Sequence, residues 1–184
     1  MKTTHAITKT LAFLSVALLA SGATYGSEPA QLSLTPEIAI FDRTERIEGI
    51  TLSIWGENPQ TALALGIVNG STGKSAGLSW AFILNYAENY KGIQWAPINY
   101  VTGDFLGWQG GFVNYTGGTM KGLQWGAVNY AGKLTGLQFG FVNYAETAKT
   151  GVQIGIVNLL PENAWFSELP DGLAPGMIIV NWRF

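Results

Sequence analysis

The stretch Gly122-Leu-Gln-Trp-Gly-Ala-Val-Asn-Tyr130 is the unit from which most of this chain is built. It returns as Gly136-Leu-Gln-Phe-Gly-Phe-Val-Asn-Tyr144 and Gly151-Val-Gln-Ile-Gly-Ile-Val-Asn-Leu159, and upstream over residues 107–115 and 92–100. The motif asparagine recurs at spacings of 16, 14, 15, 15, 14 and 15 residues, as Asn69, Asn85, Asn99, Asn114, Asn129, Asn143 and Asn158. Self-similarity at such a period identifies a repeat protein.

The composition is unusual for a protein surface that faces water, and it argues against a nucleic-acid partner. Charged residues make up 12% of the 184-residue chain and hydrophobic residues 47%. A soluble domain usually carries about 25% charged residues, so much of this surface is expected to face something other than water. Ten basic residues against twelve acidic ones leave a net charge of -2, whereas a nucleic-acid partner calls for a basic surface.

The first residues have the pattern of a secretory signal peptide. A basic segment with Lys2 and Lys9 precedes an apolar run over residues 11–20, which the small residues Ser21-Gly-Ala23 follow. An apolar run of about ten residues is too short to span a bilayer as a helix. We therefore expect a signal peptide at 1–23, a short linker at 24–30 and a single β-repeat barrel domain at 31–184.

Each repeat predicts one strand of about eleven residues followed by a tight turn rich in Gly, Asn, Asp, Ser and Thr. No helical periodicity is visible after residue 30. Strands before and after the repeats, at 31–41, 48–55 and 176–184, bring the number to about ten. The repeat strands are expected at 60–69, 75–86, 90–100, 105–115, 119–130, 133–144 and 148–159.

The two faces of each expected strand differ. Bulky apolar residues occupy the first, third and often fifth positions after the repeat glycine, and Gln, Gly and Val occupy the alternate positions. Charges fall in turns or near strand starts, and tyrosines fall at strand ends. This pattern favours an all-β, antiparallel, up-and-down transmembrane β-barrel, with its bulky face toward lipid and its glutamines toward the lumen.

Two other folds fit part of the pattern. In a β-solenoid with coils of about 15 residues, the motif asparagines would stack in a ladder. Against it, a stack of Trp80, Trp95, Trp125 and Phe139 would overfill so small an interior. A soluble sandwich would instead turn the bulky face inward.

The repeats, the segments Gln31-Leu-Ser-Leu34 and Ile47–Gly56, and the terminal Asn181-Trp-Arg-Phe184 together resemble a bacterial surface-repeat family with Gly-Leu-Gln-x-Gly-x-Val-Asn-Tyr repeats. Its members are exported proteins of Gram-negative bacteria and spirochaetes, mostly described as surface or outer-membrane proteins. The resemblance covers nearly all of the chain after the leader, and it implies no biochemical activity or site residues. The closing residues Val180, Trp182 and Phe184 also resemble the C-terminal signal by which outer-membrane barrels are recognised for assembly.

The residues needed for common catalytic chemistry are missing. The chain has no cysteine, and its single histidine, His5, lies in the leader, so the usual nucleophile triads and zinc sites are not available. We expect no catalytic residue, no cofactor and no metal. The one polar constellation is either a hydrogen-bonded amide belt or a neutral lining for a small solute. It comprises Gln94, Gln109, Gln124, Gln138 and Gln153.

Two functional hypotheses follow. The first is a small non-enzymatic barrel of the cell outer membrane with a structural or narrow-pore, porin-like role, exposed at the cell surface by its 160–175 loop. Its partners would be outer-membrane lipids and the barrel-assembly machinery. The second is a secreted or periplasmic β-repeat binding module that recognises a glycan or a protein partner.

Overall fold

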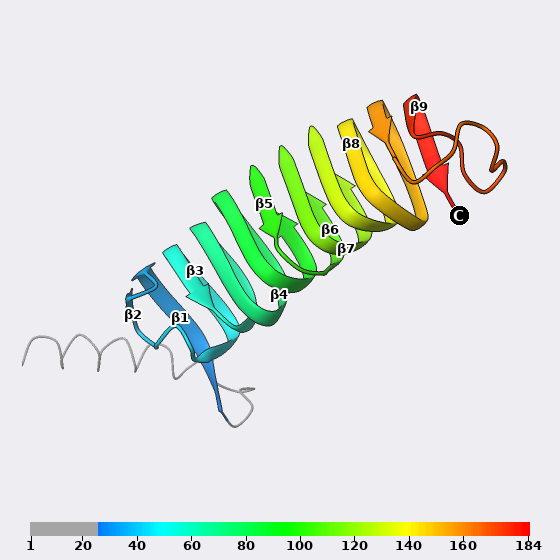
Figure 1. Ribbon diagram of the computed structural model, residues 1–184. Helices are drawn as coiled ribbons and strands as arrows, with labels where there is room; N and C mark the ends of the chain where they lie inside the picture. The colour runs from blue at the N-terminus through cyan, green and yellow to red at the C-terminus, as the bar shows by residue number, and fades with distance from the viewer. Residues whose placement is uncertain (1–25) are drawn as a thin grey trace, which may run out of the picture.

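The chain winds into a stack of about eight coils in the computed structural model, which describes residues 26–184 (Figure 1). The described strands form one sheet, and no helix occurs among them. Two strands, β4 and β8, are longer than two repeats, because strand pairing continues through the bends of the coil. The strands are β1 (Ser27–Thr35), β2 (Ile38–Ala39), β3 (Arg46–Asn58), β4 (Gln60–Trp95), β5 (Ile98–Val101), β6 (Phe105–Gly110), β7 (Val113–Trp125), β8 (Val128–Leu159) and β9 (Gly176–Arg183).

The pairing of these strands contradicts the expected antiparallel transmembrane barrel, and with it the porin-like assignment. Strands β1 and β3 to β8 pair in parallel, and the antiparallel pairs are β1 with β2 and β8 with β9, near the two ends of the stack. The fold is a parallel β-solenoid, the alternative that the asparagine spacing indicated.

The register explains why identical repeats favour stacking over hairpins. Asn99 pairs with Asn114, which pairs with Asn129, and the glutamine, glycine and tyrosine positions match in the same way. In an antiparallel hairpin, a repeat residue would face a different position of the neighbouring copy at nearly every height. Parallel stacking sets each position beside its own copy, so interactions between like residues are repeated along the whole stack.

The aromatic residues that argued against a solenoid lie on its outside. Trp80, Trp95, Trp125 and Phe139 are 46, 40, 49 and 46% exposed. The expectation of an overfilled interior was wrong, because it assumed that the bulky face of each repeat turns inward. The smaller and amide-bearing face turns inward instead.

Glycines form one corner of each coil. Gly92, Gly107, Gly122 and Gly136 have φ angles of 135°, 137°, 128° and 137°, which side-chain-bearing residues rarely adopt. The stacking is also too close for a side chain, since a Cβ on Gly122 would lie 2.1 Å from the carbonyl oxygen of Gly107. The repeat glycine is therefore required both for the bend and for the approach of the next coil.

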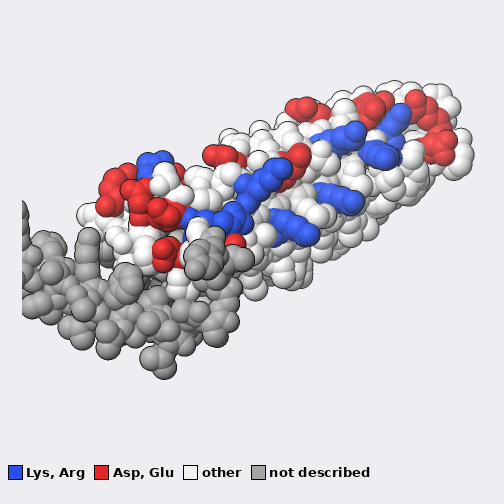
Figure 2. Space-filling view, turned by 90° about the horizontal axis from the view of Figure 1, so that it is seen from below, with Lys and Arg blue, Asp and Glu red and all other residues white. Residues whose placement is uncertain are grey.

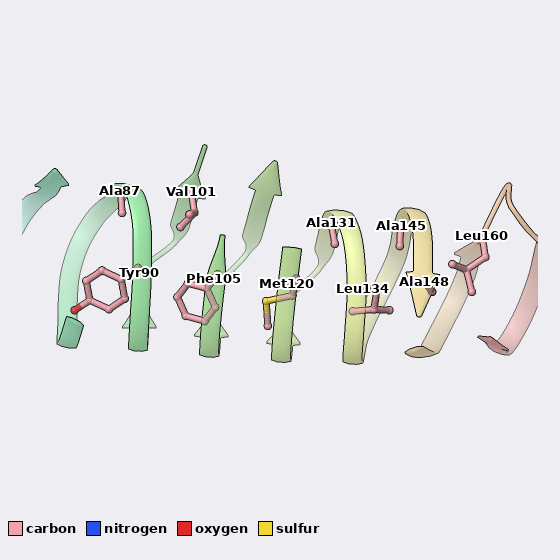
Figure 3. Packing of buried hydrophobic residues seen from close by; sticks show 10 residues of the cluster. All are labelled: Ala87, Tyr90, Val101, Phe105, Met120, Ala131, Leu134, Ala145, Ala148 and Leu160. Atoms are coloured by element: carbon pink, nitrogen blue, oxygen red, sulfur yellow. The ribbon is translucent and has the colours of Figure 1, made fainter. Parts of the chain in front are cut away.

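The apolar half of the interior consists of two facing rows (Figure 3). One row contains Tyr90, Phe105, Met120 and Leu134, and the rings of Tyr90 and Phe105 stack with centroids 6.1 Å apart. The facing row consists of smaller side chains, which leave space for the larger ones: Ala87, Val101, Ala131 and Ala145, with Leu160 at its end.

The C-terminal end of the solenoid is covered. Strand β9 pairs with residues 151–159 of β8, and the 160–175 loop folds over β9. The backbone N–H of Phe184 donates to the carbonyl of Asp171 at 2.8 Å, and the Arg183 guanidinium donates to Glu168 at 2.7 Å. A covered end leaves no long strand edge on which another chain could pair.

The fold begins earlier than the expected domain boundary at residue 31. Strand β1 begins at Ser27, inside the segment 24–30 that was expected to be a linker. The expected signal peptide at 1–23 lies outside the described residues.

Candidate binding surfaces

The glutamines singled out from the sequence lie in the interior as one hydrogen-bonded ladder. Gln94, Gln109, Gln124, Gln138 and Gln153 are 0 or 1% exposed. From Gln109 onward, the Nε2 of each donates to the Oε1 of the glutamine one coil toward the N-terminus, at distances from 2.8 to 3.2 Å. Within the ladder only the Oε1 of Gln153, at its C-terminal end, has no hydrogen-bond partner among residues 26–184, and the buried side chains present no polar surface to a passing solute.

A second ladder, of asparagines, runs beside the first with the opposite polarity. From Asn69 to Asn158, the Nδ2 of each motif asparagine donates to the Oδ1 of the next one toward the C-terminus, at distances from 2.8 to 3.4 Å. The amide dipoles of the two ladders therefore oppose each other along the axis. The polar half of the interior can be buried because nearly all of its amide groups are paired in this way.

The three residues that resemble an assembly signal lie on β9 and just after it. Val180 pairs with Ile154 and Trp182 with Val152, and the Trp182 indole donates to the carbonyl of Pro170 at 2.9 Å. Phe184 follows the strand and is 60% exposed. The structure brings Val180 and Trp182 together with the last coil, where they help to cap it.

An apolar groove, with a volume of about 1060 Å³, runs along the outer bend of the C-terminal coils. Trp95, Trp125, Phe139 and Ile154 form one side of this groove, at the same position of their repeats, and Gly110 holds that position between the two tryptophans. Ring contacts fix the two tryptophans of this side. Trp108 packs edge to face against Trp95 with ring centroids 5.2 Å apart, and it stacks against Trp125 with centroids 6.3 Å apart.

The other side and the floor of the groove come from neighbouring repeat positions. Phe112, Phe141 and Ile156 stand on the bend and are 71, 64 and 64% exposed. Between the two sides lie glycines of the bend, Gly126, Gly140 and Gly155, which bring the backbone to the surface of the groove. Small residues next to large ones create the hollow.

Strand β9 closes the groove at one end. Its pairing with β8 shifts register between Gly155 and Asn158, and Ile179 has a φ of 71°. This irregularity exposes two consecutive side chains, Ile178 and Ile179, at 69 and 71%, where regular alternation would turn one of them inward. A β-branched residue with positive φ is strained, so the surrounding structure holds these two isoleucines at the groove against a local cost.

The groove offers almost nothing for a polar ligand to bind. None of its lining side chains carries a carboxylate, ammonium, amide or hydroxyl group. Backbone donors of the lining are already used, since Phe112 N–H donates to Pro97 at 2.8 Å and Phe141 N–H to Ala127 at 3.0 Å. The groove is suited to apolar surface and is poorly suited to a sugar, whose hydroxyls need partners.

A row of tyrosines follows the solenoid on another side of the coil. Tyr100, Tyr115, Tyr130 and Tyr144 stack with ring centroids 4.7 to 5.4 Å apart. Because each ring covers the next, edges and hydroxyls face outward and the ring faces are not free to stack on a sugar. A hydrogen bond from Tyr130 to Glu146 raises the pKa of Tyr130 to about 12.

Two further tyrosines stand near the N-terminal coils. Burial, followed by the hydrogen bond that its hydroxyl donates to Glu57 at 2.5 Å, raises the pKa of Tyr86 to about 12. Burial also raises the pKa of Tyr90, whose hydroxyl has no hydrogen-bond partner among residues 26–184. None of these phenols is placed to act as an acid or base near neutral pH.

Residues 26–184 hold no cluster of His, Cys, Asp and Glu that could bind a metal ion. The same residues contain no helix with the length and hydropathy that a bilayer crossing requires. No family model, curated protein or solved structure matches this chain. The resemblance to surface-repeat proteins therefore stays an expectation from the repeat motif.

Sequence reasoning found the residues that line the groove but not the groove itself. The alternation of bulky and small residues is visible in the sequence, where Gly110 stands at the position that other repeats fill with Trp, Phe or Ile. In the structure the Trp95 ring lies over Gly110, where a Cβ would come within 2.6 Å of it. The signal that could have located the groove is the recurrence of Gly or Ala between two bulky positions on a bend.

Proposed function

We propose that this protein is an exported, non-enzymatic binding module that holds an apolar segment of a partner protein in the groove. The observation that carries the proposal is a long aromatic and aliphatic groove, in whose lining the indole N–H groups of Trp95 and Trp125 are the only polar side-chain groups. Monomeric proteins rarely expose apolar patches of this kind unless they serve an interaction. Aromatic residues such as Trp and Phe are also the side chains that contribute most at protein interfaces.

The dimensions of the groove favour an extended segment. From the Trp95 position to β9 it crosses about five strand spacings, which amounts to about 24 Å at about 4.8 Å per spacing. An extended segment of about seven residues has that length. Its apolar side chains would contact the walls, and its backbone would keep its own polar groups toward water.

A glycan is the second candidate from the sequence, and the structure favours it less. Sugar binding usually combines an aromatic face with hydrogen-bonding side chains, and the groove has only the first. Outer-membrane lipids and the barrel-assembly machinery were expected as partners only of a transmembrane barrel. This proposal includes neither of them.

The export of the protein is inferred from the pattern of the leader. The mass of the mature chain tests it, because that chain should begin after Ala23.

Trp95 and Trp125 allow binding in the groove to be followed by their own fluorescence. We expect an apolar extended peptide rich in Leu, Val and Phe to cause a saturable change in tryptophan emission. Serine at two exposed groove positions, Phe112→Ser with Phe141→Ser, should weaken that binding by at least about tenfold, because each side chain removes contact area from the partner.

Phe82→Ser is the matched control, since Phe82 is 68% exposed and lies outside the groove lining. It should bind the peptide as the unmodified protein does. A scrambled polar peptide and a soluble cello-oligosaccharide complete the comparison. If the oligosaccharide saturates the signal and the apolar peptide does not, or if neither binds, the proposed partner class is wrong.

A further inference from the structure

A second surface lies about half a coil away from the groove, beside the turns of the solenoid. It is a shallow depression of about 540 Å³ that Lys74, Lys91 and Lys121 line together. Lys133 continues it, because it pairs with Thr119, another lining residue. Arg46 adjoins it and donates to the carbonyl of Lys74 at 3.4 Å. We call Lys74, Lys91, Lys121 and Lys133 the basic edge.

The basic edge faces solvent, and its lysines form no ion pair within residues 26–184. All four ammonium-bearing side chains are exposed. Within residues 26–184, the ion pairs involve Arg43, Arg46 and Arg183, and none of them includes a lysine of this edge. Seen from below the view of Figure 1, basic side chains gather into a stripe along the stack (Figure 2).

The coil geometry fixes the spacing of these charges. Lys91 pairs with Leu106, and Leu106 pairs with Lys121, so the two lysines are separated by two strand spacings, about 10 Å. The row follows the axis of a rigid sheet. A linear polymer with regularly spaced negative charges could lie along it and contact several lysines at once.

Polar groups lie between the lysines. Asn89 and Asp104 link successive turns, because Asp104 N–H donates to Asn89 at 2.9 Å and Thr119 N–H donates to Asp104 at 2.7 Å. Together with Thr119, these residues give the depression amide and hydroxyl groups that the apolar groove lacks. Asp104 contributes the one carboxylate of the lining, which lysines on both sides outnumber.

We propose that the basic edge binds an acidic polysaccharide laid along the solenoid axis. Lysines would meet its anionic groups, and the intervening amides and hydroxyls would meet its sugar hydroxyls. The features expected of a nucleic-acid site are absent. Tyr90 and Phe105, the aromatic residues of the lining, are only 3 and 1% exposed and cannot stack on bases. The edge also lacks the arginine forks that grip phosphates in pairs.

This site does not depend on the proposed groove function. The two surfaces use different residues of each coil, so a partner segment and a polysaccharide could be bound at the same time. The protein would then connect an apolar protein segment to an anionic polymer.

The test uses alginate, a polymer of uronic acids, with dextran as the neutral polysaccharide and a single-stranded oligonucleotide as the alternative polyanion. We expect alginate to bind and dextran not to bind, with affinity falling as salt increases. Lys91→Gln with Lys121→Gln should weaken alginate binding by about tenfold, because two exposed charge contacts are lost. Lys91→Arg with Lys121→Arg should retain most of it.

Two further variants locate the effect. Arg43→Gln removes one positive charge that is paired with Glu57 and should leave alginate binding nearly unchanged. The Phe112→Ser, Phe141→Ser variant should bind alginate normally, so that failure of the groove proposal can be told from failure of this one. Circular dichroism establishes that each variant is folded. Unchanged binding after the Gln substitutions, equal binding of dextran, or tighter binding of the oligonucleotide would overturn the proposal.

Discussion

At the scale of single residues, the fold depends on side chains that are small or that pair with their own copies. The corner glycines permit a backbone conformation and a contact distance that no other residue allows. The interior amides are buried at low cost because each one has a partner in the next coil. A substitution at one of these positions disturbs two neighbouring coils as well as its own.

Alanine substitutions at two glycines distinguish the energetic cost of the close approach between coils from the cost of backbone strain. Gly122→Ala should lower the free energy of unfolding by several kcal/mol, because its φ is 128° and the new Cβ would lie 2.1 Å from the Gly107 oxygen. Gly73→Ala should lower it by only about 1 kcal/mol. The residue has a φ of 58°, so the backbone is strained, but the new Cβ would have no other atom within 4 Å. Urea denaturation of both variants measures the difference, and equal losses would show that stacking distance is not the main constraint.

Tyrosine ionisation should make the protein sensitive to alkali. The pKa values of Tyr86 and Tyr130 are raised to about 12 in the folded chain, against about 10 when unfolded. Above pH of about 10 the unfolded chain loses these protons first, so stability falls as pH rises toward about 12 and is fully present below about 10. Urea denaturation across this range should show the fall.

The variant Tyr86→Phe, combined with Tyr130→Phe, tests the source of this sensitivity. It removes two of the three phenols whose pKa is raised, Tyr90 being the third, so its stability should fall less over the same pH range. Tyr144→Phe serves as the comparison, because it removes a phenol from the same row. A slope that does not change in the double variant would assign the alkaline sensitivity to other groups.

At the scale of elements, β9 and the 160–175 loop act as the end cap of the stack. The cap pairs with β8, supplies Ile178 and Ile179 to the groove, and is fixed by the contact between Arg183 and Glu168, which lowers the pKa of Glu168. Without it, the last coil would present an unpaired parallel strand. The same element therefore shapes the groove and is expected to limit aggregation.

Truncation should show how much of the chain forms the cap. A chain ending at Pro175 loses β9, exposes the edge of β8, and is expected to form large assemblies by edge pairing. A chain lacking only Phe184 should stay monomeric, because that side chain is 60% exposed. Size-exclusion chromatography with light scattering distinguishes the two. A monomeric protein after removal of β9 would contradict the capping role.

At the scale of the whole molecule, the solenoid turns a short repeat into long surfaces of uniform character. One position of the repeat gives the tyrosine row, two others give the sides of the groove, and the turn positions give the basic edge. The groove and the basic edge lie on different parts of the coil, which would keep the two proposed partners, one apolar and one charged, apart. This separation is why the two proposed binding activities can be tested with independent variants.

The sequence by itself determined the repeat, its period, the all-β class and the lack of common catalytic residues. These depend on local pattern: Asn99, Asn114 and Asn129 recur at a fixed spacing, and turn residues separate apolar alternation. It also identified Gln94 to Gln153 as one set. Alternation alone could not distinguish a barrel from a solenoid, because both folds place the same bulky face outward.

Tertiary structure decided the direction of strand pairing, and through it the groove. Parallel pairing depends on contacts between residues about 15 positions apart, and the local pattern of one strand is the same for either direction. The groove needed a further nonlocal event, since Ile178 and Ile179 reach it only through the register shift between β8 and β9. The basic edge likewise exists because stacking brings Lys74, Lys91 and Lys121 from three separate repeats into one row.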